Sequence, residues 1–356
     1  MKTVVEKYLN YDDKFNNEMM EKAGAIIRSG GLVAFPTETV YGLGANALDT
    51  DAAKKIYEAK GRPSDNPLIA HISDKDQVDV LAKNVSDKAK KLMDKFWPGP
   101  MTLVFEKKDI VPMGVTGGLS TVAIRMPDNE IALNLIGAAG VPIAAPSANS
   151  SGRPSPTLAS HVLEDMDGRI DMIIDGGQVN IGIESTIVDM TCEPPMILRP
   201  GYITKAMLEA EIGQVAVDKI ITIKDKKELS DDYKPKAPGM KYRHYAPKAD
   251  FVMFEGDIAE VVSHINNITK LNAEKGLKTG IIATDETLTK YENEIVVSIG
   301  SRDNGRTVAK NLYKVLRDFD SMDVDVIYGE TFYDDDLGSA IMNRLIKAAG
   351  YRIEKV

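Results

Sequence analysis

Length and composition allow two packed domains and exclude several classes of protein. The chain has 356 residues, of which 43% are hydrophobic and 27% charged, so it can bury cores and is not globally disordered. Its net charge of −9 gives no overall field that would attract nucleic acid or an anionic membrane. Cys192 is the single cysteine, which excludes an internal disulfide. No apolar run reaches about 18 residues, so we expect no transmembrane helix. The shortage of cysteine fits a reducing cytosol, so we expect a cytoplasmic location.

Residues 1–212 alternate apolar, strand-like runs with helix-like stretches. Many short strands with helices between them predict an α/β domain with a mixed, twisted sheet rather than a regular parallel repeat. The expected strands are Leu32–Phe35, Leu68–Ile72, Thr102–Phe105, Thr121–Arg125, Val141–Ala145, Met172–Asp175, Thr186–Asp189 and Met196–Leu198. The expected helices are Glu18–Ser29, Asp51–Lys60, Val85–Phe96 and Asn129–Ala138.

Two further regions follow this domain. Residues 213–248 are rich in Lys and Pro with scattered Tyr, and predict a linker or a functional loop. Residues 249–356 return to alternating strands and helices, whose spacing predicts a smaller, Rossmann-like, parallel α/β domain. Its expected strands are Phe251–Phe254, Thr279–Ala283, Glu294–Ser298 and Val326–Tyr328, and its expected helices include Arg306–Phe319 and Leu337–Ala349.

The segment FPTETVYGLGAN, residues 35–46, follows a predicted strand. We interpret it as a tight turn before a helix, with hydroxyl and backbone N–H groups that can bind an anion; an ordinary Gly-rich turn is the alternative. Residues 42–47 also match the loose dinucleotide pattern GxGxxA. The glycines lie too far beyond the strand for a Rossmann turn, so we discount that match.

Two proline-stiffened loops carry further candidates. Lys60 and Arg62 place two cations at a helix end, although Lys60 could simply complement the helix dipole. The segment from Ala145 to Pro154 clusters small hydroxyl and amide side chains after a strand. It suits a phosphate or a ribose, or it is a plain polar loop.

Three arginines, Arg62, Arg125 and Arg199, lie in short segments bounded by proline. Their planar donor forks suit carboxylate and phosphate. His71 is alone in an apolar strand, which is typical of a packed, hydrogen-bonded histidine. The sequence has no GxxxxGK[ST], HExxH or GxSxG motif, and Cys192 has no identifiable activating neighbour.

Five motifs in this order resemble the threonylcarbamoyl-AMP synthase family, also called the YrdC-like family. They are PTETVYGLG, Lys60-Gly61-Arg62, Ser147-Ala148-Asn149, GIESTIVD and LRPG. The segments APGMKYRHYAP and AIMNRLIKAA resemble its long, two-domain form, so the likeness covers nearly the whole chain. The resemblance implies an N-terminal YrdC-like domain and a nucleotidyltransferase. The reaction would form threonylcarbamoyl-AMP and pyrophosphate from L-threonine, bicarbonate and ATP, for threonylcarbamoylation of adenosine in tRNA.

The resemblance also implies site residues and partners. Lys60, Arg62 and Tyr245 are expected to be catalytic. ATP is expected at Arg62, Asn66, Thr121, Ser147, Asn149, Arg153, Arg199 and Tyr245, and threonine at Thr39, His71, Arg125 and Ser185, with Arg125 on its carboxylate. Mg²⁺ is expected to arrive with ATP, with no protein ligand assigned. A separate tRNA threonylcarbamoyl transferase would use the product, and direct tRNA binding is expected to be weak or absent.

Other functions stay open at this point. Carbamoyl transfer from carbamoyl phosphate occurs in YrdC-like modules of hydrogenase maturation proteins, but their zinc-finger-like cysteines are absent here. An RNA-binding module of the same fold is disfavoured by the acidic charge and the lack of RNP-like aromatic residues. A Rossmann oxidoreductase is the third alternative.

Tyr245 lies in the linker between Pro238 and Pro247, in a segment that also holds Arg and His. We expect this segment to fold back as a lid that keeps water from a labile carbamoyl adenylate; a passive tether is the alternative. Tyr245→Ala is then expected to lower adenylate formation and leave the fold intact, as measured by product chromatography and circular dichroism. Unchanged activity would contradict the lid.

Overall fold

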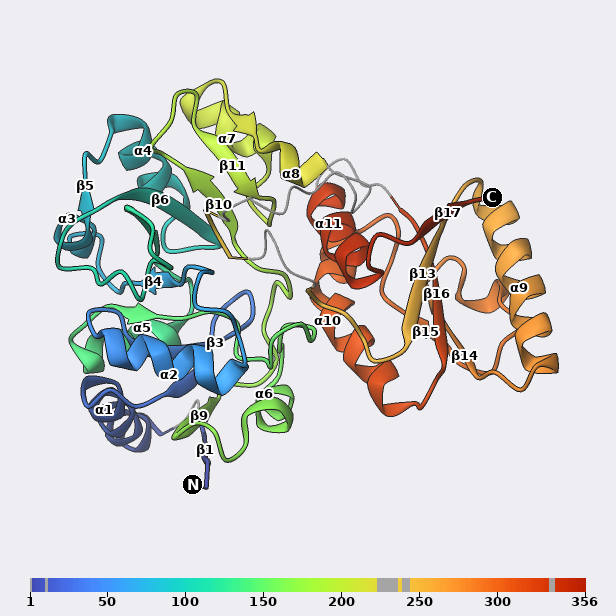
Figure 1. Cartoon of the computed structure of the whole chain (residues 1–356), viewed down its shortest axis with the longest axis horizontal. Helices are drawn as coiled ribbons and strands as arrows, with labels where there is room; N and C mark the ends of the chain where they lie inside the picture. Colours follow the sequence, from blue (N-terminus) through green and yellow to red (C-terminus); the bar gives the residue numbers. More distant parts are fainter. Residues whose placement is uncertain (1, 10–11, 223–235, 239–243, 333–336) are drawn as a thin grey trace. The chain divides into compact units, whose positions relative to one another are not determined.

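The computed structural model of the chain describes residues 2–9, 12–222, 236–238, 244–332 and 337–356, and these divide into two compact units (Figure 1). The first unit holds the described residues up to 151, together with 155–221 and 236–238. The second holds residues 152–154, residue 222 and the described residues from 244 to the C-terminus. Of the predicted linker, the structure describes residues 213–222, 236–238 and 244–248. Within the proposed lid, residues 239–243 lie outside the described residues, whereas residues 244–247 are described.

Twelve strands among the described residues of the first unit form one sheet. They are β1 (Val4–Lys7), β2 (Val33–Pro36), β3 (Tyr41–Asn46), β4 (Ile69–His71), β5 (Ala82–Lys83), β6 (Met101–Lys107), β7 (Thr121–Arg125), β8 (Ile143–Ala144), β9 (Met172–Asp175), β10 (Thr186–Asp189), β11 (Met196–Arg199) and β12 (Ala216–Val217). The order is β1-β9-β2-β3-β8-β4-β7-β6-β10-β11-β12, and β5 pairs with β6. Parallel and antiparallel pairs both occur, which confirms the predicted mixed sheet.

Helices cover this sheet and bury their apolar faces against it. They are α1 (Asp13–Arg28), α2 (Thr50–Lys60), α3 (Gln77–Leu81), α4 (Asp87–Phe96), α5 (Glu130–Ala139), α6 (Ala159–Met166), α7 (Lys205–Ile212) and α8 (Lys219–Thr222). In α1 the buried residues Met20, Ala23 and Ile27 follow helical spacing and pack in one cluster with residues of α5, β2 and β9. Asp12 caps this helix by accepting a hydrogen bond from the Phe15 N–H.

The predicted turn at residues 35–46 is wrong over half of its length, because residues 41–46 form strand β3 in a hairpin with β2. Tyr41, Leu43 and Ala45 alternate onto the main core, as strand residues do. The glycines are explained by packing. A Cβ atom at Gly44 would lie 2.8 Å from the Phe35 ring and 2.7 Å from Ile143, so no larger residue fits.

The first unit continues beyond Ile212, where the linker was predicted to begin. Strand β12 pairs in parallel with β11, and the short helix α8 follows it. The sequence signal there is weak because β12 spans two residues only.

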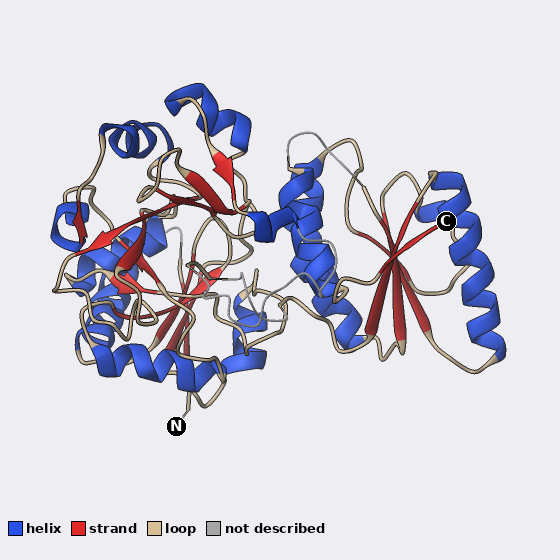
Figure 2. Ribbon diagram, turned by 45° about the horizontal axis from the view of Figure 1, so that its top comes forward, coloured by secondary structure: helices blue, strands red, loops and turns tan. Residues whose placement is uncertain are grey.

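The second unit is a parallel sheet between helices. Its strands are β13 (Asp250–Glu255), β14 (Thr279–Ala283), β15 (Val296–Ser298), β16 (Val326–Glu330) and β17 (Ile353–Lys355); its helices are α9 (Ile258–Glu274), the 3-10 helix η2 (Leu288–Lys290), α10 (Gly305–Ser321) and α11 (Gly338–Ala348). The order is β15-β14-β16-β13-β17, and each pair is parallel. Figure 2 shows this sheet edge-on with helices on both faces, which confirms the Rossmann-like prediction.

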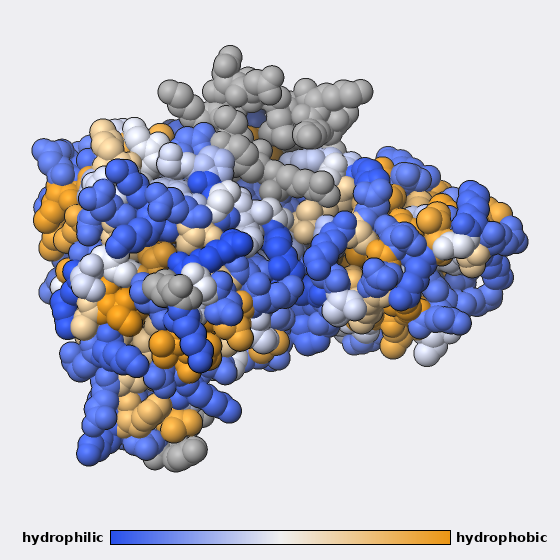
Figure 3. All heavy atoms as spheres, turned by 60° about the horizontal axis from the view of Figure 1, so that its bottom comes forward, coloured by the Kyte–Doolittle hydropathy of each residue, from blue (hydrophilic) through white to orange (hydrophobic). Residues whose placement is uncertain are grey.

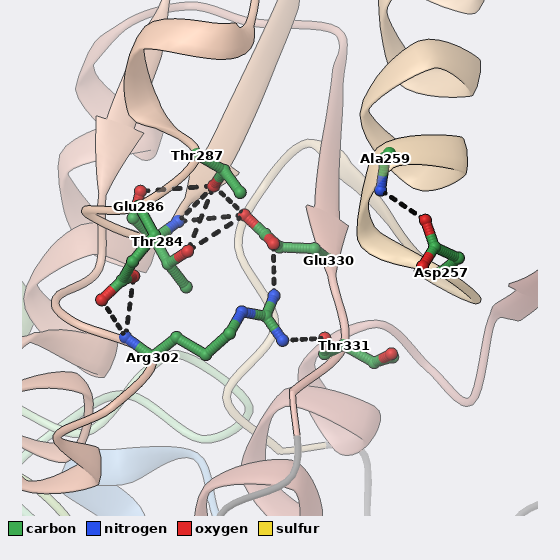
Figure 4. A network of polar contacts seen from close by, with 8 residues as sticks. All are labelled: Asp257, Ala259, Thr284, Glu286, Thr287, Arg302, Glu330 and Thr331. Carbon is green, nitrogen blue, oxygen red and sulfur yellow. Dashed lines mark hydrogen bonds and ion pairs between the residues drawn. The ribbon is translucent and has the colours of Figure 1, made fainter.

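An ion pair between the buried Glu330 and the partly exposed Arg302 connects the segments at the carboxyl ends of β14, β15 and β16 (Figure 4). Glu330, the last residue of β16, is 2% exposed and accepts hydrogen bonds from the Thr284 N–H at 3.0 Å and from the Thr287 hydroxyl. Its other oxygen accepts from Arg302, whose guanidinium also donates to the Thr331 carbonyl at 3.2 Å. Both carboxylate oxygens are therefore satisfied, as burial of a charge requires.

The surface drawn in Figure 3 is mostly hydrophilic, and its hydrophobic residues occur in scattered small groups. Within the described ranges, no helix combines the length and apolar character needed to cross a membrane.

Glu330→Gln is expected to destabilise the second unit by about 2–3 kcal/mol. The substitution removes the charge of the buried Glu330 carboxylate that pairs with Arg302. Because the Arg302 side chain is 29% exposed, water can solvate its charge, and the loss of stability is small for the breaking of an ion pair with a buried member. Amide exchange followed by mass spectrometry reads the two units separately, so peptides from residues 249–356 should exchange faster while those from the first unit do not change. Glu354→Gln, on the exposed end of β17, is the matched control. Equal exchange in both variants would contradict a stabilising role.

Candidate active site

The loop between β2 and β3, residues 37–40, is buried and is held together by Thr37. The Thr37 hydroxyl donates to a carbonyl of the loop at 2.7 Å, accepts from two of its N–H groups at 3.2 Å, and lies 2.8 Å from the Thr39 hydroxyl. The N–H groups of Ile181 and Gly182 bind two of the loop's carbonyls, at 2.9 and 3.1 Å. Because buried backbone groups must be paired, these bonds allow a polar loop to lie inside the unit.

Helix α2 delivers Lys60 at its C-terminal end. Asp49 caps the start of the helix, and Gly61 ends it with a positive φ of 61°. Lys60 is 4% exposed, and its Nζ donates to the Ser147 carbonyl at 2.5 Å and to the Asn149 carbonyl. A buried ammonium requires such partners, so Lys60 does more than complement the helix dipole.

The loop that carries Ser147 and Asn149 runs beside strand β3. The Leu43 N–H donates to the Pro146 carbonyl, and the Ala148 N–H donates to the Tyr41 carbonyl, both at 2.8 Å. The hairpin therefore positions the loop that binds Lys60, and the two motifs PTETVYGLG and Ser147-Ala148-Asn149 meet in space.

Arg62 and Asn66 lie together in the loop after α2. Arg62 Nη2 donates to the Asn66 carbonyl at 3.2 Å and to the Pro67 carbonyl at 3.0 Å. Asn66 is 1% exposed, and no described residue donates to its Oδ1. Thr121 begins strand β7 and Arg125 ends it. At a rise of about 3.3 Å per residue, the backbones of these two predicted substrate-binding residues are about 13 Å apart along the strand.

Strands β10 and β11 bring Ser185 and Arg199 into contact. Arg199 Nε donates to the Ser185 carbonyl and its Nη2 to the Ser185 hydroxyl, both at 3.1 Å. The same hydroxyl lies 2.8 Å from the hydroxyl of Thr102, a residue that the sequence did not single out. A predicted ATP ligand and a predicted threonine ligand thus belong to one buried cluster.

Arg125 lies beside His71 because β7 and β4 pair in parallel. Arg125 Nη2 is 2.6 Å from Glu38 Oε1, and the two side chains are 4% and 6% exposed. Burial first, and then the positive charge of Arg125, lower the pKa of His71 to about 3. The imidazole is therefore neutral near pH 7, and its Nδ1 lies 3.1 Å from the Ile69 carbonyl.

Glu38, like Thr102, is a residue that the sequence analysis missed. Its signal was available, because a lone acidic residue between Thr37 and Thr39 interrupts a segment of hydroxyl and glycine residues. Its pairing with Arg125 depends on strands that are distant in sequence, which a reading of the local motif does not supply.

Contacts made by the 37–40 loop and by β3 link eight of the predicted residues of the first unit. Arg62, Asn66 and Thr121 are not among them: the first two contact each other in the loop after α2, and Thr121 lies at the opposite end of β7 from Arg125. The loop binds the segment that leads to Ser185 and contacts Arg125 through Glu38, while β3 binds the loop around Ser147. The residues joined in this way are Thr39, Lys60, His71, Arg125, Ser147, Asn149, Ser185 and Arg199.

Arg153 and Tyr245, both predicted to contact ATP, belong to the second unit. Arg153 Nη2 lies 3.1 Å from Asp320 Oδ2 of α10. Tyr245 is 5% exposed and stacks on Tyr313, with ring centroids 5.1 Å apart. Their role toward ATP stays a prediction. Since Tyr245→Ala also removes a ring contact of about 0.5–1.5 kcal/mol, Tyr245→Phe, which keeps the ring, is the better variant to pair with it.

Comparison with known proteins decides the family. A threonylcarbamoyl-AMP synthase from Bacillus subtilis (strain 168) is 51% identical over 339 residues, covering 95% of both chains. One from Pyrococcus abyssi is 49% identical over 348 residues, covering 98% of this chain and 99% of that protein. The chain belongs to the threonylcarbamoyl-AMP synthase family.

Two family models match most of the chain. Residues 25–201 match the model described as "Telomere recombination", and residues 203–350 match the one described as "Threonylcarbamoyl-AMP synthase, C-terminal domain". A crystal structure of P. abyssi Sua5 complexed with L-threonine is similar over 100% of both chains, with 47% identity and a TM-score of 0.91. The predicted family and fold are therefore confirmed.

No group of three or more His, Cys, Asp and Glu side chains that could hold a metal ion occurs among the residues that the structure describes. Basic and hydroxyl side chains dominate the linked site instead, so its chemistry is suited to anions.

The low pKa of His71 predicts a pH dependence of stability. The unfolded chain binds a proton to His71 below about pH 6.5 but the folded chain does so only near pH 3, so stability falls as the pH is lowered through this window. The slope is up to about 1.4 kcal/mol per pH unit. Urea unfolding of wild type and His71→Gln between about pH 7 and 4.5 should give curves that converge at low pH. Parallel curves would show that His71 titrates normally.

Proposed function

We propose that the first unit makes threonylcarbamoyl-AMP and pyrophosphate from L-threonine, bicarbonate and ATP at the site around the 37–40 loop. The observation that carries this proposal is the burial of three cations, Lys60, Arg125 and Arg199, beside the hydroxyls of Thr39 and Ser185. Charged side chains are rarely buried unless they have polar or charged partners. The related P. abyssi protein binds L-threonine, and this chain resembles it over its full length.

The charges of the site match the charges of these substrates. ATP, bicarbonate and the threonine carboxylate bring several negative charges into one place, and their mutual repulsion opposes reaction. Fixed ammonium and guanidinium groups in a region of low dielectric stabilise such charge without reorganising. Lys60 and Arg199 would face ATP, and Arg125 would bind the amino-acid carboxylate.

The chemistry needs positioning and charge neutralisation, with no covalent enzyme intermediate. The threonine nitrogen bonds to the bicarbonate carbon, and water leaves to give a carbamate. A carbamate oxygen then attacks the α-phosphorus of ATP, and the bond from that phosphorus to the departing pyrophosphate breaks. Groups held at fixed positions supply effective concentration and electrostatic stabilisation for both steps. The neutral imidazole of His71 adds no competing positive charge.

Mg²⁺ would accompany ATP, bound mainly by phosphate oxygens and water, and would neutralise phosphate charge. The product would pass to a separate tRNA threonylcarbamoyl transferase, since the net charge of −9 disfavours direct binding of tRNA.

Incubation with ATP, Mg²⁺, labelled bicarbonate and L-threonine is expected to give labelled threonylcarbamoyl-AMP and pyrophosphate, separated by chromatography. Reactions without bicarbonate, with serine, or with carbamoyl phosphate in place of bicarbonate are the controls. Product from carbamoyl phosphate alone would indicate the carbamoyl transfer reaction, and no product from bicarbonate would contradict the proposal.

Lys60→Met is expected to lower the rate of this reaction about 100-fold, the usual effect of removing one preorganised group that stabilises charge. Lys54→Met is the matched control on the same helix, because Lys54 is exposed and pairs only weakly with Asp51 at 3.3 Å. Equal rates in the two variants would show that Lys60 has a structural role only.

A further inference from the structure

Glu38 has an environment that a purely structural carboxylate does not require. Its side chain is 6% exposed, yet no described residue donates a hydrogen bond to either of its carboxylate oxygens. Arg125 Nη2 lies 2.6 Å from Oε1 and balances the charge, but the geometry of this contact is not that of a hydrogen bond. A buried carboxylate without donors is costly, and native structures retain such groups where a ligand or a reaction uses them.

The pair of Glu38 and Arg125 is complementary to an α-amino acid. A zwitterion carries an ammonium and a carboxylate on adjacent bonds, and the site presents an acceptor and a cation side by side. The guanidinium of Arg125 has N–H groups available to bind a carboxylate. Among the described residues, its Nε donates to the Gly99 carbonyl at a long distance of 3.4 Å, and its Nη2 donates to no group. The Thr39 and Ser185 hydroxyls belong to the same linked site.

We infer that Glu38 binds the α-ammonium group of the amino-acid substrate and accepts the proton that this group must lose before it attacks bicarbonate. This inference rests on the proposed function and adds a residue to it. The ammonium gives one proton to Glu38. The free amine then bonds to the bicarbonate carbon, and a second N–H proton leaves with the bicarbonate hydroxyl as water, so the carbamate and a protonated Glu38 remain. Glu38 later returns its proton to solvent.

The same arrangement explains how the site would distinguish an amino acid from a 2-hydroxy acid, which lacks the amino nitrogen. A 2-hydroxy acid of the same shape keeps the carboxylate that Arg125 recognises but offers no positive charge to Glu38. It would leave the buried carboxylate with one weaker, neutral donor, which lowers affinity by about 10- to 100-fold.

The test compares two ligands on the full-length protein by titration calorimetry. They are L-threonine and the matching 2,3-dihydroxybutanoate, which carries a hydroxyl in place of the amine. Wild type is expected to prefer threonine by about 10- to 100-fold, and Glu38→Gln to reduce this preference to less than about threefold. Glu58→Gln, an exposed glutamate on α2, should keep the wild-type preference. A preference that survives in folded Glu38→Gln would overturn the inference.

Glu38→Asp keeps the charge opposite Arg125 and covers the case in which Glu38→Gln does not fold. Withdrawing the carboxylate by one methylene is expected to weaken threonine about 10-fold and the hydroxy acid much less. If both ligands weaken by the same factor, Glu38 acts only on Arg125 and the inference is overturned. A wild-type protein that forms the adenylate while binding both ligands equally would overturn the inference alone, whereas failure to bind threonine would overturn the proposed function as well.

Discussion

The site depends on one constraint, which is that a polar four-residue loop must be buried at the end of the β2–β3 hairpin. Thr37 meets this requirement by bonding within the loop, and the N–H groups of Ile181 and Gly182 bind it from outside. Leaving a buried polar group unpaired costs about 1–3 kcal/mol, so each of these bonds restricts where the loop can lie. Arg125 and the segment before Ser185 take their positions against this loop, and the loop around Ser147 takes its position against the adjoining strand β3.

Two buried glutamates, each paired with an arginine, illustrate how a structural carboxylate differs from a reactive one. Glu330 in the second unit receives hydrogen bonds from a backbone N–H and a hydroxyl in addition to Arg302. Glu38 in the first unit has Arg125 at 2.6 Å, and no described donor satisfies its oxygens. The first arrangement offsets the cost of burying charge, and the second leaves capacity for a ligand.

Much of the fold could be predicted from local pattern. Strands β7, β9, β10 and β14 have the expected bounds, because short β-branched and apolar runs there end at polar, proline or glycine residues. Strand β3 could not be predicted, since its glycines resemble a turn and are explained only by the approach of Phe35 and Ile143 from elsewhere in the sequence. The site residues likewise divide into those that local pattern predicts and those that depend on tertiary structure. The basic and hydroxyl residues stood out as motifs, whereas Glu38 and Thr102 acquire their importance from tertiary pairing. The placement of Arg153 and Tyr245 with the second unit also depends on tertiary contacts.

Because Lys60 is the last residue of helix α2, the length of this helix determines where the Lys60 side chain lies. Its first turn is set by the Asp49 cap and its end by Gly61, so the number of residues between them decides where the ammonium points. Each residue advances an α-helix by 1.5 Å and about 100° of rotation. One insertion or deletion between the two caps would turn Lys60 away from the carbonyls of Ser147 and Asn149. Homologous chains that use this lysine should therefore vary in the composition of α2 while keeping its residue count.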